Sequence, residues 1–129
     1  MNCTFRHYHP SKFETEYCLW LEARRQAGEI RSIRLYPNLK ISRQKTWKAD
    51  FEVERIDGTI EIHEAKGLNP SDDNFRLRLA LFFEKNPDAI VYVNKVRVYP
   101  SESGRRILNL PRKTRRRAIP KRLDRRIIA

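Results

Sequence analysis

Apolar side chains recur at helical spacing in the first part of the chain, at Phe13, Tyr17, Trp20 and Leu21. Before them, Ser11 and the glutamate three positions later form the capping box S-x-x-E that opens many helices. A glycine at position 28 is the residue type that commonly follows the end of a helix. The pattern therefore predicts a helix from Ser11 to about residue 27.

The next segments alternate apolar and polar residues, which indicates strands. Residues 30–41 (I-R-S-I-R-L-Y-P-N-L-K-I) form an extended segment in which Pro37 marks an edge or a bend. Residues 42–48 make a polar, basic connector. Residues 50–67 (D-F-E-V-E-R-I-D-G-T-I-E-I-H-E-A-K-G) hold two strands around the turn dipeptide Asp57-Gly58, which predicts a β-hairpin.

A second helix and two more strands follow the hairpin. Ser71 can cap this helix, whose first turn is acidic and whose apolar residues continue to Asn86-Pro87. Residues 89–93 (A-I-V-Y-V) have the pattern of a buried strand, and residues 96–99 alternate. The order helix, strand, hairpin, helix, strand predicts an α/β sandwich with a mixed sheet.

The length of the hairpin turn decides which side chains share a face of the sheet. A two-residue loop places Asp50 opposite Ala65, on the other face from Glu64. A three-residue loop, with Gly58 left-handed in a bulge, places Asp50 directly opposite Glu64. Lys66 lies on the face of Glu64 because residues two apart in a strand point the same way. We adopt the three-residue loop, since it brings all three charged groups together.

These three side chains have the composition of a metal site. The carboxylates of Asp50 and Glu64 supply hard oxygen ligands, which Mg²⁺ prefers, and Lys66 adds a cation beside them. The alternative is an ordinary solvated hairpin. Carboxylates set among strand-forming apolar residues are costly to place, however, which favours a functional site.

Glu14 has two interpretations. It is the third residue of the capping box, a role worth about 1 kcal/mol. A carboxylate in the first turn of a helix beside a metal site is also a candidate ligand or water-orienting group. Glu16 and Glu22 offer the same group two and eight residues further on. The residues alone leave these interpretations open.

Length and composition favour one intracellular domain. The 129 residues suffice for one modest core, and no run approaches the roughly 18 apolar residues of a membrane span. The first ten residues lack the apolar region of a secretory signal. The two cysteines, Cys3 and Cys18, lack metal-ligand spacing and give no reason to expect a disulfide.

Positive charge is concentrated at the C-terminal end. Of the net charge of +12, residues 105–129 contribute 11 Lys and Arg against the single acid Asp124, whereas residues 1–104 hold 17 basic and 15 acidic residues. We expect a folded body in residues 1–104 and a basic tail in residues 105–129. Such a tail attracts nucleic acid by counterion release, although a solubilising end is the alternative.

Basic residues also lie near the candidate metal site. The connector before Asp50 can hold phosphates or form an ordinary solvated loop. An arginine of the second helix can stabilise a phosphoryl charge or cover the edge of the core. The predicted nucleic-acid-binding residues are Arg43, Lys45, Lys48, Arg76, Arg78, Arg112, Lys113, Arg115, Arg116 and Arg117.

Five short motifs occur in an order that resembles the PD-(D/E)xK nuclease superfamily. Within it, the chain is most similar to small phage endonucleases of the endonuclease I type of Holliday-junction resolvase. Residues 11 to 95 carry the resemblance, with Ala49 where the name-giving proline would be. The motifs are S-K-F-E (residues 11–14), A-G-E-I (27–30), K-A-D-F (48–51), E-A-K-G (64–67) and F-R-L-R-L-A-L-F (75–82).

The resemblance implies a restriction-endonuclease-like core, in which helices flank a central mixed sheet. It also implies a catalytic set of Glu14, Asp50, Glu64 and Lys66. The metal would be Mg²⁺, with Mn²⁺ as a substitute, and its ligands would be Asp50, Glu64, the Ala65 carbonyl and Glu14.

The implied activity is metal-dependent hydrolysis of phosphodiester bonds in DNA, selective for branched structures. The end-cleaving subunit of heteromeric transposases has a similar layout, and a basic protein that binds nucleic acid without cutting it is the competing class. A homodimer is expected because symmetric cutting of two strands needs two sites. The expected location is the cytoplasm, that of the host cell if the protein is phage-encoded.

Overall fold

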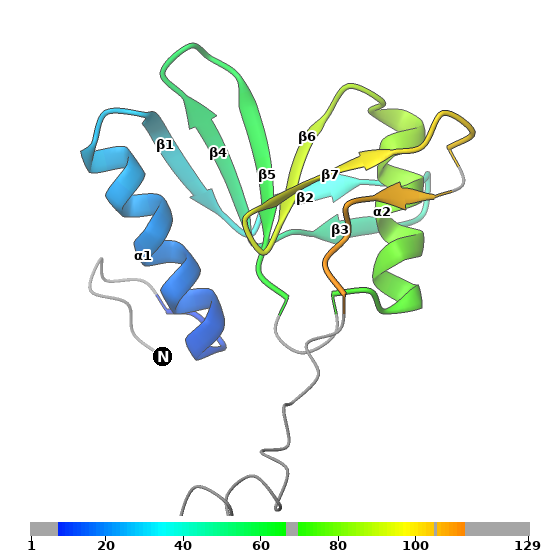
Figure 1. The fold of residues 1–129 in the computed structure, drawn as a ribbon, viewed down its shortest axis with the longest axis horizontal. Coiled ribbons are helices and arrows are strands. Elements are labelled where there is room, and N and C mark those ends of the chain that lie inside the picture. The colour runs from blue at the N-terminus through cyan, green and yellow to red at the C-terminus, as the bar shows by residue number, and fades with distance from the viewer. Residues whose placement is uncertain (1–7, 67–69, 105, 113–129) are drawn as a thin grey trace, which may run out of the picture.

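Two helices and eight strands make up residues 8–66, 70–104 and 106–112, the part of the chain that the computed structural model describes (Figure 1). In chain order they are α1 (Lys12–Gln26), β1 (Ile30–Leu35), β2 (Asn38–Lys40), β3 (Thr46–Lys48), β4 (Phe51–Arg55), β5 (Ile60–Glu64), α2 (Asp73–Lys85), β6 (Ile90–Val93), β7 (Val96–Pro100) and β8 (Ile107–Leu108). Neither of the two described helices is long and apolar enough to cross a membrane.

Six of the strands form one mixed sheet in the order β1-β4-β5-β6-β7-β8. The β5–β6 pair is parallel and the other pairs are antiparallel. The parallel pair needs a long crossover, which α2 supplies between the two strands. The prediction of an α/β fold with a mixed sheet is therefore confirmed.

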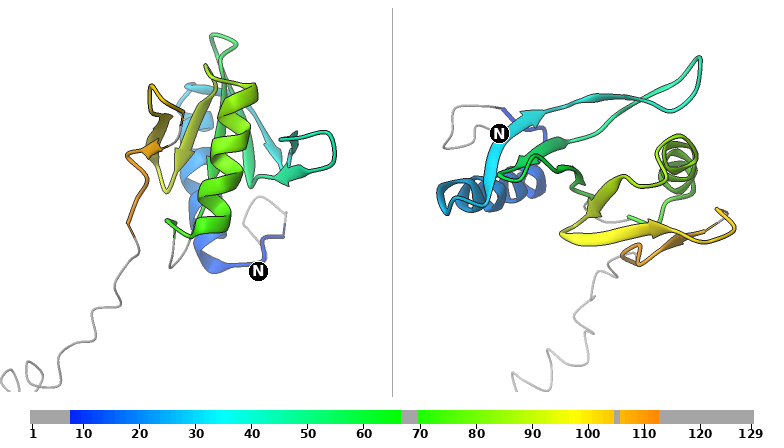
Figure 2. Two further views of the ribbon diagram at one scale, coloured as in Figure 1. Left: turned by 90° about the vertical axis from the view of Figure 1, so that its right-hand side faces the viewer. Right: turned by 90° about the horizontal axis from the view of Figure 1, so that it is seen from above.

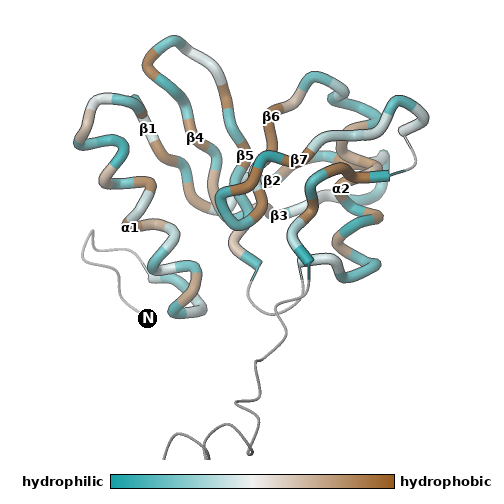
Figure 3. The backbone as a smooth tube through the Cα atoms, viewed as in Figure 1, coloured by the Kyte–Doolittle hydropathy of each residue, from teal (hydrophilic) through white to brown (hydrophobic). Residues whose placement is uncertain are grey.

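The sheet separates two hydrophobic cores, one on each face (Figures 1 and 2). On one face, α1 packs on β4 through a cluster that includes Tyr17, Leu21 and Phe51. On the other, α2 and the β2–β3 hairpin cover Ile62 and the valines of β6. Figure 3 shows apolar and polar residues alternating along β4 and β5. Successive side chains of a strand point to opposite faces, so Val53 of β4 enters the α1 core and Ile62 of β5 enters the α2 core.

The β4–β5 hairpin has the three-residue loop predicted from the sequence. The Arg55 amide donates to the Thr59 carbonyl, and Gly58 adopts φ +89°, the left-handed conformation of a bulge. Phe51 pairs with His63, so the register continues to Asp50 opposite Glu64. The prediction that these two carboxylates are neighbours is confirmed.

Two local predictions are wrong. Residues 42–48 are not only a polar connector: their last part is β3, which pairs with β2 and buries Trp47 against α2. One aromatic residue in a basic segment gives no alternation to detect. The second helix is capped by Asp72, whose carboxylate accepts from the Phe75 amide, while the Ser71 hydroxyl donates to the Pro111 carbonyl.

The predicted boundary between body and tail is also displaced. Within residues 106–112, β8 pairs with β7, and Ile107 and Leu110 pack against the α2 core. The Ser71 hydroxyl also donates a hydrogen bond to the Pro111 carbonyl. The body thus includes this segment, because its apolar residues complete the sheet edge despite the basic residues around them.

Candidate functional site

The candidate site lies where β4 begins and β5 ends, beside the first turn of α1. Crossed hydrogen bonds join the two strand ends: the Ala65 amide donates to Asp50 Oδ2 at 2.8 Å, and the Asp50 amide donates to Glu64 Oε2 at 3.2 Å. Each carboxylate is thus fixed through one oxygen by the backbone of the opposite strand. The hairpin register alone brings these groups together.

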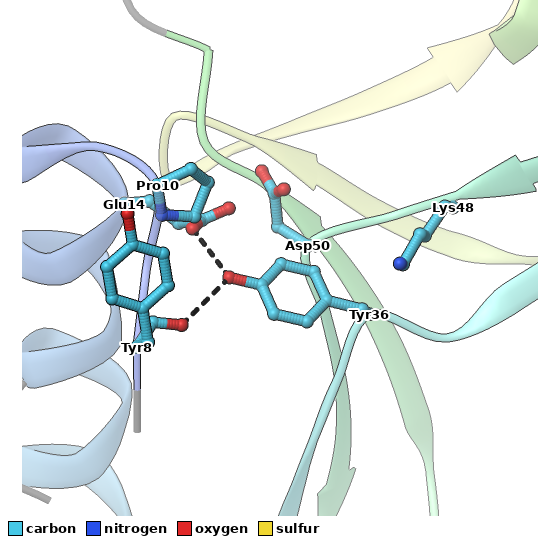
Figure 4. A pocket seen from close by; sticks show the side chains of 6 residues that line it. All are labelled: Tyr8, Pro10, Glu14, Tyr36, Lys48 and Asp50. Carbon is cyan, nitrogen blue, oxygen red and sulfur yellow. Dashed lines mark hydrogen bonds between the residues drawn. The ribbon is translucent and has the colours of Figure 1, made fainter. Parts of the chain in front are cut away.

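Glu14 approaches the same strand end from α1 (Figure 4). Its amide donates to the hydroxyl of the Ser11 cap, but its carboxylate turns away from the cap and takes a hydrogen bond from the Tyr36 hydroxyl at 2.8 Å. His9 Nδ1 lies 3.3 Å from the same carboxylate oxygen. Glu14 is buried, whereas Glu16 is exposed and Glu22 pairs with an arginine of its own helix. The geometry selects Glu14 as the carboxylate of α1 that faces Asp50.

The three carboxyl groups repel one another, and Glu14 and Glu64 are buried while Asp50 is half-buried. Burial, the charge of Glu64 and a hydrogen bond with Glu14 raise the pKa of Asp50 to about 9. Burial raises the pKa of Glu64 to about 7, although Lys66 and Arg78 oppose this increase. Burial and the hydrogen bond to Glu14 also raise the pKa of Tyr36. Without a cation this cluster retains protons, which is the electrostatic condition of a site suited to a positive ion.

Lys66 is held next to the carboxylates by Asn94. The Lys66 amide donates to Asn94 Oδ1 and the Asn94 side-chain amide donates to the Lys66 carbonyl, both at 2.7 Å. The Lys66 ammonium lies 4.7 Å from the centre of the Phe75 ring, and the Arg78 guanidinium lies 5.9 Å from that centre. Two cations from different elements thus converge on the side of Glu64.

A pocket of about 370 Å³ opens beside Glu14 and Asp50. Figure 4 shows Tyr8, Pro10 and Tyr36 around the two carboxylates, with Lys48 at the far rim. The Lys48 ammonium lies 5.6 Å from the centre of the Tyr36 ring. The pocket combines aromatic walls, acidic groups and one cation.

Within the described residues, no group of three or more His, Cys, Asp and Glu side chains is positioned to hold a metal ion. The donor chemistry nevertheless suits a hard cation, because Asp50, Glu64 and Glu14 present carboxylate oxygens and each retains an oxygen beyond its backbone or tyrosine partner. A divalent ion would replace the shared protons that now reduce the repulsion among them.

The predicted nucleic-acid contacts fall into separate places. Arg43, Lys45 and Lys48 are exposed on the β2–β3 hairpin, and Lys48 reaches the pocket. Arg78 faces Glu64, whereas Arg76 points outward beside Asp73. Arg112 is exposed at the end of the described body. The predictions for Lys113, Arg115, Arg116 and Arg117 lie outside the described residues.

Sequence reasoning missed His9, Tyr36 and Asn94 as parts of the site. Tyr36 precedes a proline and has φ +52°, and Asn94 has φ +49°, so both mark turns. A turn residue is visible in a sequence, but the side chain that it aims at a distant carboxylate or backbone is not. His9 lies in an irregular segment with no periodic signal.

A buried polar chain under α1 was also missed. The Lys95 amide donates to the Tyr17 hydroxyl, which donates to His63 Nδ1 at 2.7 Å, and His63 Nε2 donates to Glu61 at 2.8 Å. Arg55 donates to the other Glu61 oxygen. Burial lowers the pKa of His63 and raises that of Tyr17. Burial would also raise the pKa of Glu61, but hydrogen bonds from His63 and Arg55 outweigh it and lower that pKa to about 2. The chain therefore combines a neutral tyrosine and histidine with an ionised glutamate.

Comparison with protein-family models, with curated proteins and with solved structures gives no match for this chain. The assignment of a function accordingly depends on the geometry of the carboxylates and on the motifs in the sequence.

Proposed function

We propose that the protein is a metal-dependent endonuclease of the PD-(D/E)xK type, which hydrolyses phosphodiester bonds in DNA. The observation that carries this proposal is the meeting of Glu14, Asp50 and Glu64 at one end of the sheet, beside Lys66. These residues come from three separate segments of the chain. A structural explanation for so many buried like charges is poor, because each raises the cost of ionising the others.

The residues that would hold the metal are Asp50, Glu64 and Glu14, together with the Ala65 backbone carbonyl. Mg²⁺ suits these ligands, and Mn²⁺ is expected to replace it. When bound, such an ion lowers the pKa of a coordinated water and stabilises negative charge on a phosphoryl oxygen.

Side chains of the protein would orient the attacking water and add positive charge at the phosphate. Lys66 would orient the attacking water and place a positive charge at the phosphate, and the double hydrogen bond with Asn94 fixes the backbone from which it extends. Arg78 would add a second positive charge beside Glu64. Tyr36, kept protonated by its raised pKa, donates to Glu14 and holds that carboxylate toward Asp50.

The basic residues support DNA as the substrate. Lys48 lines the pocket, and Arg43 and Lys45 are exposed further along the same β2–β3 hairpin, where they would hold the phosphate backbone without reading the bases. The small body leaves little room for a separate sequence-reading module, which favours recognition of DNA shape. Branched DNA is the proposed preference, and a homodimer would supply the second site for symmetric cutting.

The test is cleavage of labelled DNA by the purified protein, with a four-way junction and a linear duplex of the same sequences as substrates. We expect cutting in Mg²⁺ or Mn²⁺, none in EDTA, and faster cutting of the junction. Tight binding of both DNAs without metal-dependent cutting would instead assign the protein to the competing class, a basic binding protein without catalysis.

A further inference from the structure

The pocket beside the candidate metal site is larger than one phosphate group needs. Its volume of about 370 Å³ falls within the roughly 300–1,000 Å³ of pockets that hold small organic ligands. Its acidic end consists of Glu14 and Asp50, and its walls are Tyr8, Pro10 and Tyr36. A ligand that fills it must therefore combine a flat apolar part with groups that interact with charges.

Tyr8 is the most exposed of the large apolar side chains in the described residues, with 64% of its surface accessible. Its position is nevertheless fixed. The Tyr8 carbonyl lies 3.4 Å from the Tyr36 hydroxyl, which donates its proton to Glu14 at 2.8 Å, and the next residue, His9, is buried with its ring 5.8 Å from that of Phe51. An aromatic ring is thus presented to solvent at the pocket by an anchored backbone (Figure 4).

Lys48 completes the set of groups. Its ammonium lies over the Tyr36 ring on the opposite rim from Tyr8, and the side chain is exposed. These groups suit one nucleotide. Its base can stack on the aromatic ring, and its phosphate can bind Lys48 and a divalent ion held by the carboxylates. An uncharged apolar ligand would offer no group to interact with the Lys48 ammonium or with a cation held by the two carboxylates.

We propose that this pocket receives one unpaired nucleotide of the DNA substrate, with its base stacked on Tyr8 and its phosphate toward Lys48. The inference rests on the proposed nuclease function, and it narrows the substrate to DNA that has an unpaired nucleotide next to the cleaved bond. A base inside an intact duplex cannot reach Tyr8 without being extruded, at the cost of its stacking and pairing. A branch point, gap or bulge supplies such a nucleotide already released.

The experiment measures dissociation constants by fluorescence anisotropy, with Ca²⁺ in place of Mg²⁺. The two probes are a linear duplex and the same duplex with one unpaired nucleotide in its middle. For the wild type we expect tighter binding of the second probe. Tyr8→Ala should weaken binding of that probe by about 5- to 150-fold, the effect of removing the stacking of one base, and leave the paired duplex unchanged.

Three further variants separate stacking from other effects. Tyr8→Phe keeps the ring and should keep the preference. Tyr99→Ala removes another exposed tyrosine, on β7 away from the pocket, and should change neither constant. Lys48→Ala should weaken the probe with the unpaired nucleotide more than the paired duplex, because the proposed contact of Lys48 is with the phosphate of that nucleotide.

Equal affinity of the wild type for the two probes would overturn the inference, and so would equal losses on both in Tyr8→Ala. Its failure is distinguishable from failure of the nuclease proposal. Metal-dependent cutting without any preference for unpaired nucleotides would support the nuclease proposal and overturn the proposed nucleotide pocket. A Tyr8-dependent preference for the unpaired nucleotide, in a protein that cuts no DNA, would support the nucleotide pocket and overturn the nuclease proposal.

Discussion

At the scale of single residues, a substitution of the Glu14 carboxylate should affect the cleavage rate but not the stability of the fold. The Glu14 backbone amide belongs to the helix cap of Ser11, whereas its carboxylate is committed to Tyr36 and faces Asp50. Glu14→Gln should therefore leave stability unchanged or slightly raised, because it removes one of three repelling charges, and it should lower the cleavage rate by orders of magnitude.

Ser11→Ala is the matched control for Glu14→Gln. It removes the hydroxyl that accepts a hydrogen bond from the Glu14 amide and should cost about 1 kcal/mol of unfolding free energy with little effect on the rate per folded molecule. Urea unfolding and cleavage kinetics on both variants check the pair. Normal cleavage by Glu14→Gln would restrict this residue to a structural role.

The raised pKa values of Asp50 and Glu64 make the stability of the metal-free protein depend on pH. Their ordinary values are 3.8 and 4.5, and in the folded protein they are about 9 and about 7. Between these values the folded state binds more protons than the unfolded state, so the free energy of unfolding should fall as pH rises from about 4 to about 9. The lowered pKa of Glu61 acts only at more acidic pH, and the lowered pKa of His63 opposes the trend only below its ordinary value of 6.5.

Chemical unfolding in EDTA across this pH range measures the slope. Asp50→Asn should flatten it, and Mg²⁺ should stabilise the wild type most at the alkaline end, where the carboxylates are ionised. Stability that rises from pH 5 to pH 9 in EDTA would contradict the proposed repulsion within this cluster.

Strand alternation places Glu64 and Lys66 on one face of the sheet, and the choice of a three-residue turn adds Asp50 as their neighbour. These patterns do not suffice for Tyr36 or Asn94. The Tyr36 side chain bonds Glu14, which is 22 residues away in the sequence, and the Asn94 side chain bonds Lys66, which is 28 residues away. Such contacts depend on tertiary packing, which local patterns do not encode.

At the scale of elements, the polar chain through Tyr17, His63 and Glu61 joins α1 to the sheet. Tyr17→Phe deletes the hydroxyl that accepts from the Lys95 amide and donates to His63, and it leaves the buried His63 Nδ1 without this partner. The expected cost is about 1–3 kcal/mol of unfolding free energy. Urea titration measures it.

The control is Tyr99→Phe, since Tyr99 is 39% exposed and water can replace its hydrogen bonds. Its effect should be close to zero. If the two substitutions cost the same, the buried chain contributes nothing particular to the docking of α1.

The elements themselves follow from the sequence to different degrees. Asp57-Gly58 and the alternating flanks predict the β4–β5 hairpin but allow a loop of two or three residues. The three-residue loop is preferred only because it groups the charged residues, and the other register would have moved every side chain to the wrong face. The β2–β3 hairpin was not predictable, because each of its strands has only three residues and Trp47 alone is buried in β3. Short strands present too few positions for a period of two to be recognised.

At the scale of the whole molecule, the folded body extends past the predicted boundary at residue 104, because it includes β8 and Leu110. Residues 113–129 contain eight Lys and Arg and one Asp. Removing them should reduce the slope of log affinity for DNA against log salt, by up to about 0.9 for each phosphate that these residues neutralise, while the carboxylate site remains.

Removing residues 105–129 instead should also destabilise the protein, because it deletes β8 and the packing of Ile107 and Leu110 on the α2 core. Salt titrations of DNA binding and thermal unfolding of both truncated chains distinguish these effects. Identical melting temperatures for the two would contradict the revised boundary, and an unchanged salt slope would exclude the tail from DNA binding.

The central claim is that Asp50, Glu64 and Lys66 form a hydrolytic site. The most direct measurement is the Mg²⁺-dependent cleavage rate of a four-way junction by Asp50→Asn, Glu64→Gln and Lys66→Ala, with Glu52→Gln as control. Glu52 is a carboxylate of the same hairpin that pairs with Arg34 at 3.8 Å. We expect each site variant to lose at least about a hundredfold in rate while DNA binding is retained, and the control to cut normally. Wild-type rates in all three site variants would contradict the account.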